Sequence, residues 1–212
     1  MEKQRSFEPL RQYLPDNCFE LVMPLILKHK VHLTISRGRK TKLGDYRNAY
    51  GNNNHRISVN GDLNKYAFLV TLIHELAHLL TYEKFGHRVQ PHGTEWKSIY
   101  SQMLYEFIQH QVLPVDITEA LVKTIKKPGA STCSEVDLQR VLNKYDKRHP
   151  AMTTVETINI GDTFALPDGR KFVRGEVIRK RIKCFLLPGM QPYSFTALYE
   201  VIDLNKLNKE IV

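Results

Sequence analysis

The stretch that decides the fold is Thr71–Leu80, which reads TLIHELAHLL. It lies within Leu63–Phe85, a run that we expect to form one long helix ended by Gly86. His74 and His78 are four residues apart, so a helix places both side chains on one face, about one turn apart. The residues around them are mostly apolar, and polar side chains are costly to bury there without a partner. A bound metal ion would offset that cost.

The spacing of the two histidines suits zinc. Both imidazoles can reach one tetrahedral ion at roughly 2.0–2.1 Å. Glu75 follows the first histidine and is offset from it by about 100° around the helix, which places its carboxylate beside the ion rather than on it. Zinc lowers the pKa of water toward ~7, and a carboxylate in this position can take the proton. The pattern therefore predicts a catalytic zinc site with His74 and His78 as ligands and Glu75 as general base.

A catalytic zinc site needs a third protein ligand and one open position. No HxxGxxH continuation follows the motif, and Glu95 and Glu106 are only formal candidates. We favour His92, in the segment PHGTEW, because it lies just before a predicted helix, where its side chain can swing back toward the first helix. His87 is the competitor, and the alternative interpretation of His87 is a solvated loop histidine.

The segments before and after the motif predict an α+β unit. Alternating, β-branched patterns mark three strands of a small antiparallel sheet: Val31–Ser36, Leu43–Arg47 and His55–Val59. Helical spacing of apolar residues marks further helices: residues 9–29, 93–111, 117–126 and 135–145. Pro15 divides the first of these segments, with Asp16 or Asn17 as the cap of its second half.

The character of the chain changes after Lys147. From Val155 onward, strand and turn patterns dominate, in VETINI, TFAL, KFV, GEVIRKRIKCFLL and FTALYEVIDL. We therefore expect two domains: residues 1–148 with the metal site, and residues 153–212 as a small basic β domain.

Composition and length limit the function classes. The chain has 212 residues, of which 42% are hydrophobic, enough for one sizeable core and a small appendage. No apolar run reaches the ~18–20 residues that a bilayer-spanning helix needs, and the N-terminus has no apolar signal core. The three cysteines are far apart and form no CxxC pair, which argues against a disulfide framework or a cysteine-based zinc finger. We expect a cytoplasmic protein with reduced thiols and no membrane partner.

A net charge of +9 favours a polyanionic partner such as nucleic acid. The positive charge gathers in two places. In the C-terminal region, alternation along VIRKRIKCF would put Arg179, Arg181 and Lys183 on one face of a strand, where they could contact phosphates. The second patch, in the basic turn before the predicted zinc helix, consists of Arg37, Arg39, Lys40 and Lys42, of which we expect Arg37, Arg39 and Lys40 to contact nucleic acid. The alternative interpretation of the first patch is a solvated edge strand protected by its charges.

The combination of HELAH at 74–78 with HGTEW at 92–96 resembles the SprT-like family of zinc metallopeptidases, to which Spartan belongs. The basic strand–turn–strand RGRKTKLGDYR, followed by HRISVN, is similar to the family as well, and the resemblance covers roughly residues 10–145. It implies a zincin-like core and zinc-dependent proteolysis. Carried over by position, the zinc ligands are His74, His78 and His92, and the catalytic residue is Glu75. In Spartan-type members the targets are proteins crosslinked to or bound on DNA, and DNA is the activator.

The cysteine pattern departs from this family. Many members append a zinc ribbon with four cysteines, whereas only Cys133 and Cys184 lie in the C-terminal part of this chain. The β region after residue 153 is then either a degenerate ribbon that has lost its metal or an unrelated small barrel. We expect no second zinc ion there.

These observations favour a zinc metallopeptidase with one Zn²⁺ per chain, a protein substrate, and single-stranded or protein-crosslinked DNA as a partner. Two alternatives remain open. The first is a DNA-binding or regulatory protein whose zinc site is structural or vestigial, although a structural site has no need of a base such as Glu75. The second is a hydrolase of a non-protein amide, because the chemistry of HExxH does not choose between these substrates.

Overall fold

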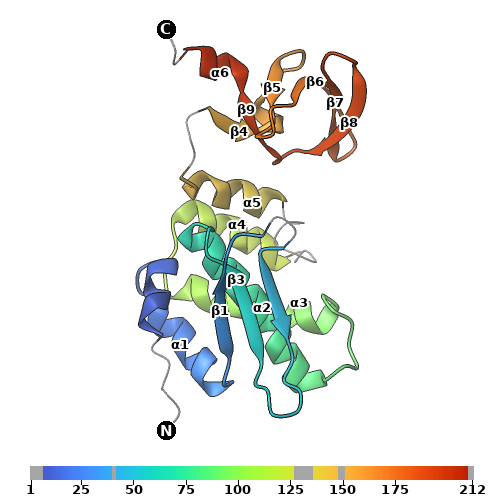
Figure 1. Cartoon of the computed structure of the whole chain (residues 1–212). Helices are drawn as coiled ribbons and strands as arrows, with labels where there is room; N and C mark the ends of the chain where they lie inside the picture. The colour runs from blue at the N-terminus through green and yellow to red at the C-terminus, as the bar shows by residue number, and fades with distance from the viewer. Residues whose placement is uncertain (1–6, 40–41, 127–135, 148–150, 210–212) are drawn as a thin grey trace. The chain divides into compact units, whose positions relative to one another are not determined.

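The computed structural model describes residues 7–39, 42–126, 136–147 and 151–209 (Figure 1). The chain divides into two compact units, Met1–Asp146 and Lys147–Val212, each with a hydrophobic core of its own. Helices and strands both contribute to the fold, which confirms the mixed α and β character expected from the sequence.

The first unit combines helices with a three-stranded sheet. Its elements are η1 (Glu8–Tyr13), α1 (Phe19–Lys28), β1 (His32–Ser36), β2 (Gly44–Arg47), β3 (Arg56–Asn60), α2 (Lys65–Phe85), α3 (Thr94–Gln109), α4 (Val115–Lys126), α5 (Val136–Leu142) and η3 (Asn143–Tyr145). The cap of α1 is Cys18, so the prediction of Asp16 or Asn17 is wrong. Asn17 adopts a left-handed φ of 64°, which asparagine tolerates in a turn, and the helix begins only after it.

The sheet of the first unit has the strand order β1-β3-β2. β2 runs antiparallel to β3 as expected, but β1 runs parallel to β3, so the prediction of an all-antiparallel sheet is wrong. Ile57 and Val59 of β3 are at most 1% exposed. The central position, with a strand on each side, keeps these apolar side chains away from water. The chain leaving β1 therefore crosses to the far edge before it returns as β2, and this connection leaves β1 and β3 pointing in the same direction.

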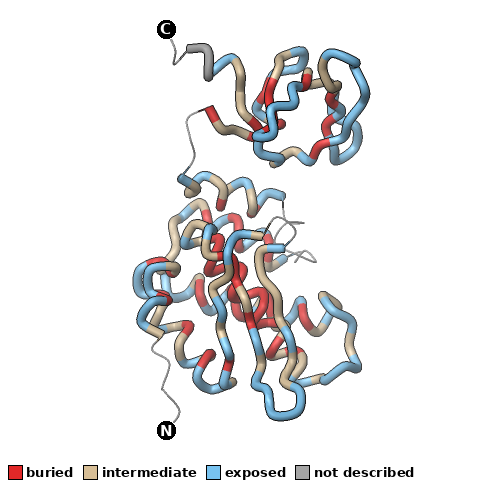
Figure 2. Tube along the Cα trace, viewed as in Figure 1, coloured by how far each residue is buried: buried red, intermediate tan, exposed pale blue. Residues whose placement is uncertain are grey.

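Helix α2 is the centre of this unit and is buried on nearly every side, as the red segments of Figure 2 show. Its apolar residues do not form a single stripe, which is typical of a helix inside a core. The helix begins where Asn64 caps it, because the side-chain oxygen accepts hydrogen bonds from the N–H groups of Tyr66 (3.1 Å) and Ala67 (3.0 Å). Gly86 ends the helix with a φ of 63°, which suits glycine.

The neighbours of α2 determine what lies at its surface. The helix packs against β2 and β3 of the sheet and against α3. This packing brings the edge strand β2, the middle of α2 and the start of α3 close to one another.

The second unit is a six-stranded antiparallel sheet with the order β4-β9-β5-β6-β7-β8. Its elements are β4 (Met152–Thr154), η4 (Val155–Thr157), β5 (Thr163–Ala165), β6 (Lys171–Ile178), β7 (Arg181–Leu186), β8 (Gln191–Thr196), β9 (Glu200–Asp203) and α6 (Leu204–Lys209). The predicted strand VETINI is instead the short turn η4 followed by a loop. Val155 and Ile158, three residues apart, are both buried, which is the pattern of a turn rather than of a strand.

Two further expectations concern the state of the cysteines and the presence of membrane-spanning helices. Cys18 and Cys184 are buried free thiols, and Cys133 lies outside the described residues. None of the helices in the described part of the chain has both the length and the apolar character that crossing a membrane requires.

Candidate metal centre

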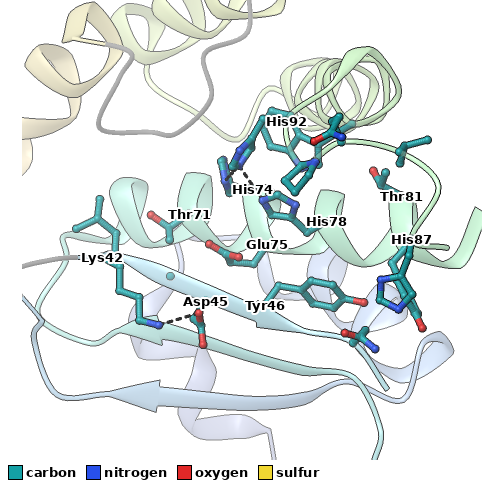
Figure 3. Close-up of a pocket in the computed structure, with 18 of the residues that line it drawn as sticks. Lys42, Asp45, Tyr46, Thr71, His74, Glu75, His78, Thr81, His87 and His92 are labelled. Carbon is teal, nitrogen blue, oxygen red and sulfur yellow. Dashed lines mark hydrogen bonds and ion pairs between the residues drawn. The ribbon is translucent and has the colours of Figure 1, made fainter. Parts of the chain in front are cut away.

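Three histidines meet at the surface of α2. His74 and His78 come from α2 itself, and His92 comes from the loop just before α3 (Figure 3). The Nε2 atom of His92 lies 3.2 Å from Nε2 of His74 and 2.9 Å from Nε2 of His78. One nitrogen of each ring therefore faces the same small volume, and the group could hold a metal ion. Three imidazole nitrogens at the wall of a cleft are a donor set that fits zinc.

The geometry of a tight turn explains why His92 reaches the other two histidines. His92 has a left-handed φ of 59°, which is uncommon for a residue with a side chain. The N–H of Gly93 donates to the carbonyl oxygen of Gln90 at 2.9 Å and closes the turn. A Cβ atom at position 93 would lie 2.9 Å from that same oxygen, so the turn requires glycine there.

Trp96, in the first turn of α3, contacts all three histidine rings. Its ring centroid lies 4.7 Å from that of His74, 5.2 Å from that of His78 and 4.7 Å from that of His92. Trp96 is fully buried, and Tyr100 stacks against it at 4.7 Å. The histidines thus have a rigid apolar wall behind them, which orients the rings without competing for their nitrogen atoms.

Burial keeps the three histidines neutral. It lowers the pKa of His74 to about 3 and that of His78 to about 4, and the neighbouring histidines act in the same direction. The pKa of His92 is lowered too, by burial and then by Lys97. A neutral imidazole is the form that binds a metal ion, so these shifts reduce competition from protons.

Glu75 lies beside the histidines, against strand β2. It is only 7% exposed, and its carboxylate lies at the cleft between α2 and β2 (Figure 3). A Cβ atom at Gly44 would lie 2.8 Å from Glu75 Cγ and from Thr71 Cγ2, and closer still to the carboxylate. Because Gly44 has no side chain, the space beside strand β2 is free for the side chain of Glu75.

The protonation of Glu75 reflects this burial. Burial raises the pKa of Glu75 to about 8, and the negative charge of Asp45 acts in the same direction. The positive charges of Arg39 and Lys42 oppose the shift. A cation at the histidines would lower the pKa of Glu75 again. A carboxyl group in these surroundings can exchange a proton near neutral pH, as general acid–base chemistry requires.

The histidines and Glu75 line a cleft of about 640 Å³ between α2, β2 and the loop that joins α2 to α3. Its two ends differ (Figure 3). One end carries Lys42 and Asp45, whose side chains pair at 2.7 Å. The other end holds Tyr46 and His87. The volume lies in the range of clefts that bind ligands.

The competing metal ligands lie outside the histidine group. The ring of His87 packs edge-on against Tyr82, with the ring centroids 5.0 Å apart. Glu95 and Glu106 are not part of the group either. In the portion of the chain that the structure describes, the predicted metal ligands that come together are His74, His78 and His92.

Gly44 and Tyr46 have roles that the sequence analysis does not assign. The ring of Tyr46 lies parallel to that of His78, with 6.3 Å between centroids and 4° between planes. The Tyr46 hydroxyl lies 2.9 Å from Nδ1 of His55, and the N–H of Ala49 donates to the same nitrogen. Both residues belong to the predicted strand Leu43–Arg47, to which the sequence analysis assigns no residue of the metal site. Their proximity to α2 depends on the strand order, which spacing in the sequence does not reveal.

The predicted nucleic-acid residues of the first unit differ in their surroundings. Arg39 is engaged within the fold: its Nε donates to Asn60 Oδ1 at 2.8 Å and its Nη1 to Ser58 Oγ at 3.2 Å. These bonds tie the loop after β1 to strand β3. Arg37 is exposed, and Lys40 lies outside the described residues.

In the second unit, Arg181 and Lys183 are exposed on β7 and alternate with buried residues, as a strand requires. Arg179 does not lie on this strand, so that part of the prediction is wrong. β6 and β7 pair as a hairpin with Ile178 opposite Arg181, and the two residues between them reverse the chain. Arg179 accordingly has a turn conformation, with a φ of 57°.

The sequence profile of the SprT-like family matches residues 7–119, slightly more than half of the chain, including all three histidines. The chain belongs to the SprT-like family. This result confirms the resemblance that HELAH and HGTEW indicated.

Curated relatives of this SprT-like chain match over shorter stretches. Protein SprT of Glaesserella parasuis serovar 5 (strain SH0165) is 61% identical over 31 residues, which are 15% of this chain and 19% of that protein. Protein SprT of Pseudomonas fluorescens (strain SBW25) is 55% identical over 29 residues, 14% and 18% of the two chains. Protein SprT of Yersinia pestis is 52% identical over 42 residues, 19% and 24%. Each match thus spans less than a quarter of the relative's length. No solved structure matches the chain significantly.

Proposed function

We propose that this SprT-like protein is a zinc-dependent peptidase with a zincin-like core. The observation that supports this most strongly is the convergence of three neutral histidine nitrogens beside the buried carboxylate of Glu75, at the wall of an open cleft. The residues that would hold one zinc ion are His74, His78 and His92. Bound zinc would polarise the carbonyl group of the scissile peptide bond and make water more acidic.

Glu75 would move the proton. Its carboxylate would accept a proton from the water that attacks the carbonyl carbon, and would then donate that proton to the leaving amine. The side chain packs closely against the backbone of Gly44, which limits the positions that the carboxylate can take on that side. The burial that raises its pKa also favours the protonated form that is needed for the second step.

Strand β2 would bind the substrate. In the described part of the chain it pairs only with β3, and it lines the cleft with Gly44 and Tyr46. An extended peptide can add to such an edge through backbone hydrogen bonds. The cleft follows α2 from Thr71 to Tyr82, about 16 Å at ~1.5 Å per residue, which is room for roughly five residues of extended peptide. This length favours a polypeptide over a small amide.

A purely structural zinc site is the weaker alternative. Structural sites are usually closed by four protein ligands. Within the described residues the group here has three, and a carboxylate that a structural site does not need lies beside them.

Replacing Glu75 with glutamine tests the proposed peptidase. Glu75→Gln removes the base and leaves the three histidines, so the variant should bind as much zinc as the wild type. Its rate of cleaving an unfolded protein should fall by about 10²–10⁴-fold. Zinc content and cleavage are measured on the same samples, with Glu106→Gln, an exposed residue outside the cleft, as the matched control. Undiminished cleavage by Glu75→Gln would reject this mechanism.

A second function, nucleic-acid binding, is favoured by a hollow of about 590 Å³ on the second unit. Among the described residues, those that line it include no acidic side chain and four cations: Arg179, Lys180, Arg181 and Lys183. Tyr193 lines the same hollow and is 38% exposed. We propose that the cations contact phosphates of single-stranded DNA while a base stacks on Tyr193. Such a surface would direct the peptidase to proteins bound or crosslinked to DNA.

Binding of a fluorescent single-stranded oligonucleotide to the full chain tests this second proposal. The double variant Arg181→Glu/Lys183→Glu should bind more weakly. The slope of log affinity against log salt concentration should shrink by about 1.4, since each of two lost phosphate contacts accounts for roughly 0.7. Lys123→Glu/Lys126→Glu, exposed on α4, changes the net charge equally and is the control. Unchanged binding by the first variant, or an equal loss in the control, would reject the surface.

A further inference from the structure

One end of the cleft carries the rings of Tyr46, Tyr82 and His87, with Thr81 beside them (Figure 3). The described residues that line the cleft there include no Lys, Arg, Asp or Glu. We call Tyr46, Tyr82 and His87 the aromatic end. The opposite end, with Lys42 and Asp45, is charged (Figure 3). A substrate chain that occupies the cleft would therefore meet different chemistry on the two sides of the metal centre.

The rings of the aromatic end are held in place by their neighbours. Tyr82 and His87 meet edge to face with centroids 5.0 Å apart, and Tyr82 also meets His55 edge-on at 5.9 Å. Tyr46 lies parallel to His78, and the contact of its hydroxyl with His55 Nδ1 restricts rotation of the side chain. Walls that are already ordered lose little entropy when a ligand binds, so they are suited to recognition.

The distance of the aromatic end from the histidines identifies the substrate residue that it would contact. Tyr82 follows His78 by four residues on α2, a rise of about 6 Å along the helix. An extended peptide advances by roughly 3.3 Å per residue and points alternate side chains to opposite sides. A side chain in the aromatic end therefore belongs to one of the two residues that follow the metal centre on the His78 side.

We propose that the aromatic end is a specificity subsite for a bulky uncharged side chain, above all an aromatic one, close to the scissile bond. This inference rests on the proposed peptidase function and names its substrate class. Edge-to-face and offset ring contacts favour an aromatic guest. A carboxylate or ammonium group would lose its hydration there without meeting an opposite charge. His87 is the exposed ring of the set and the specificity-determining residue.

Equilibrium binding to the zinc-loaded, full-length Glu75→Gln protein separates recognition from catalysis. The probes are hexapeptides of alanine and glycine that differ at one central position, occupied by phenylalanine, alanine, aspartate or lysine. The phenylalanine peptide should bind about tenfold more tightly than the others, or better. Equal affinities, or tightest binding of the aspartate or lysine peptide, would overturn the proposal.

Changes at His87 test the residue itself. His87→Ala should remove most of the preference for phenylalanine, and His87→Phe, which restores a ring, should retain it. His110→Ala, an exposed histidine outside the cleft, is the matched control and should behave as the parent protein does. Because His87 is exposed, folding and zinc content should be unaffected in all three. A phenylalanine preference that persists in His87→Ala would overturn the assignment.

Hydrolysis by the wild type keeps this inference distinct from the proposed function. If the peptides are cleaved, mass spectrometry should place the cut within one residue of the phenylalanine. Cuts scattered without regard to the ring would overturn the subsite and leave the peptidase function intact. Selective binding without any cleavage would support the subsite and contradict the peptidase function.

Discussion

The missing side chain of Gly44 is what leaves room for Glu75. A Cβ atom there would come within 2.8 Å of Glu75 Cγ and Thr71 Cγ2, which is well inside the ordinary contact distance of carbon atoms. We predict that Gly44→Ala retains the zinc content and lowers kcat/KM for peptide cleavage by about 10²-fold, because the carboxylate is displaced. Gly189→Ala, where a Cβ atom meets nothing within 4 Å, is the control. Full activity in Gly44→Ala would contradict this placement of Glu75.

Part of the candidate site was predictable from residue spacing alone. The four-residue separation of His74 and His78 fixes their relation once a helix forms. The approach of His92 depends on its φ of 59° and on the turn closed by Gly93, neither of which a single sequence reveals. The importance of Gly44 was hidden as well, because it arises only when β2 packs against α2.

At the scale of elements, Asn64 links the start of α2 to the end of α5. Its side-chain oxygen caps α2, while its amide nitrogen donates to the carbonyl oxygen of Leu142 at 3.0 Å and to Asp146 Oδ1 at 2.5 Å. We predict that Asn64→Ala lowers the free energy of unfolding of the first unit by about 2–3 kcal/mol. The loss of the helix cap accounts for roughly 1 kcal/mol of this decrease. The loss of the two hydrogen bonds that the amide nitrogen donates accounts for the rest.

Chemical denaturation of Asn64→Ala and Asn64→Ser separates these two contributions. The serine variant keeps a capping oxygen and loses the amide donor without placing a negative charge beside Asp146, so it should lose the second contribution and retain the first. An Asn64→Ala variant as stable as the wild type would show that the link between α2 and α5 contributes nothing to the free energy of unfolding.

The helices were easier to predict than the strands. Helical periodicity is a local property, and every predicted helical segment of the first unit contains a helix. The direction of β1 is not local: it follows from the burial of Ile57 and Val59, which gives β3 the central place in the sheet. VETINI has the composition of a strand, yet Val155 and Ile158 both enter the core, and this burial overrides the propensity of the residues.

On the scale of the whole molecule, the chain has two separate hydrophobic cores. We predict two calorimetric unfolding transitions, since compact units with their own cores can unfold separately. Leu72→Ala should lower the free energy of unfolding of the first unit by about 2–5 kcal/mol. Phe164→Ala should lower the free energy of unfolding of the second unit by about 3–5 kcal/mol. Both residues are fully buried. A single transition that shifts equally with either substitution would contradict two independent units.

Whole-molecule properties were the hardest to read from the sequence. The pairing of β4 with β9 joins the two ends of the second unit, and no local pattern indicates it. The net charge suggests a polyanion as partner but does not locate the surface. Arg39, counted among the free cations in the sequence, is tied to Asn60 in the fold. Arg181 keeps an exposed place beside the hollow of the second unit.

The central claim is that His74, His78 and His92 form one metal centre. The most direct test is the amount of zinc per chain in protein purified without added metal and without a metal-affinity tag. We predict about one zinc ion per chain for the wild type and for His87→Ala, and loss of zinc on gel filtration for His92→Ala. A wild type that holds no zinc even after reconstitution, or a His92→Ala variant with an unchanged zinc content, would contradict the account.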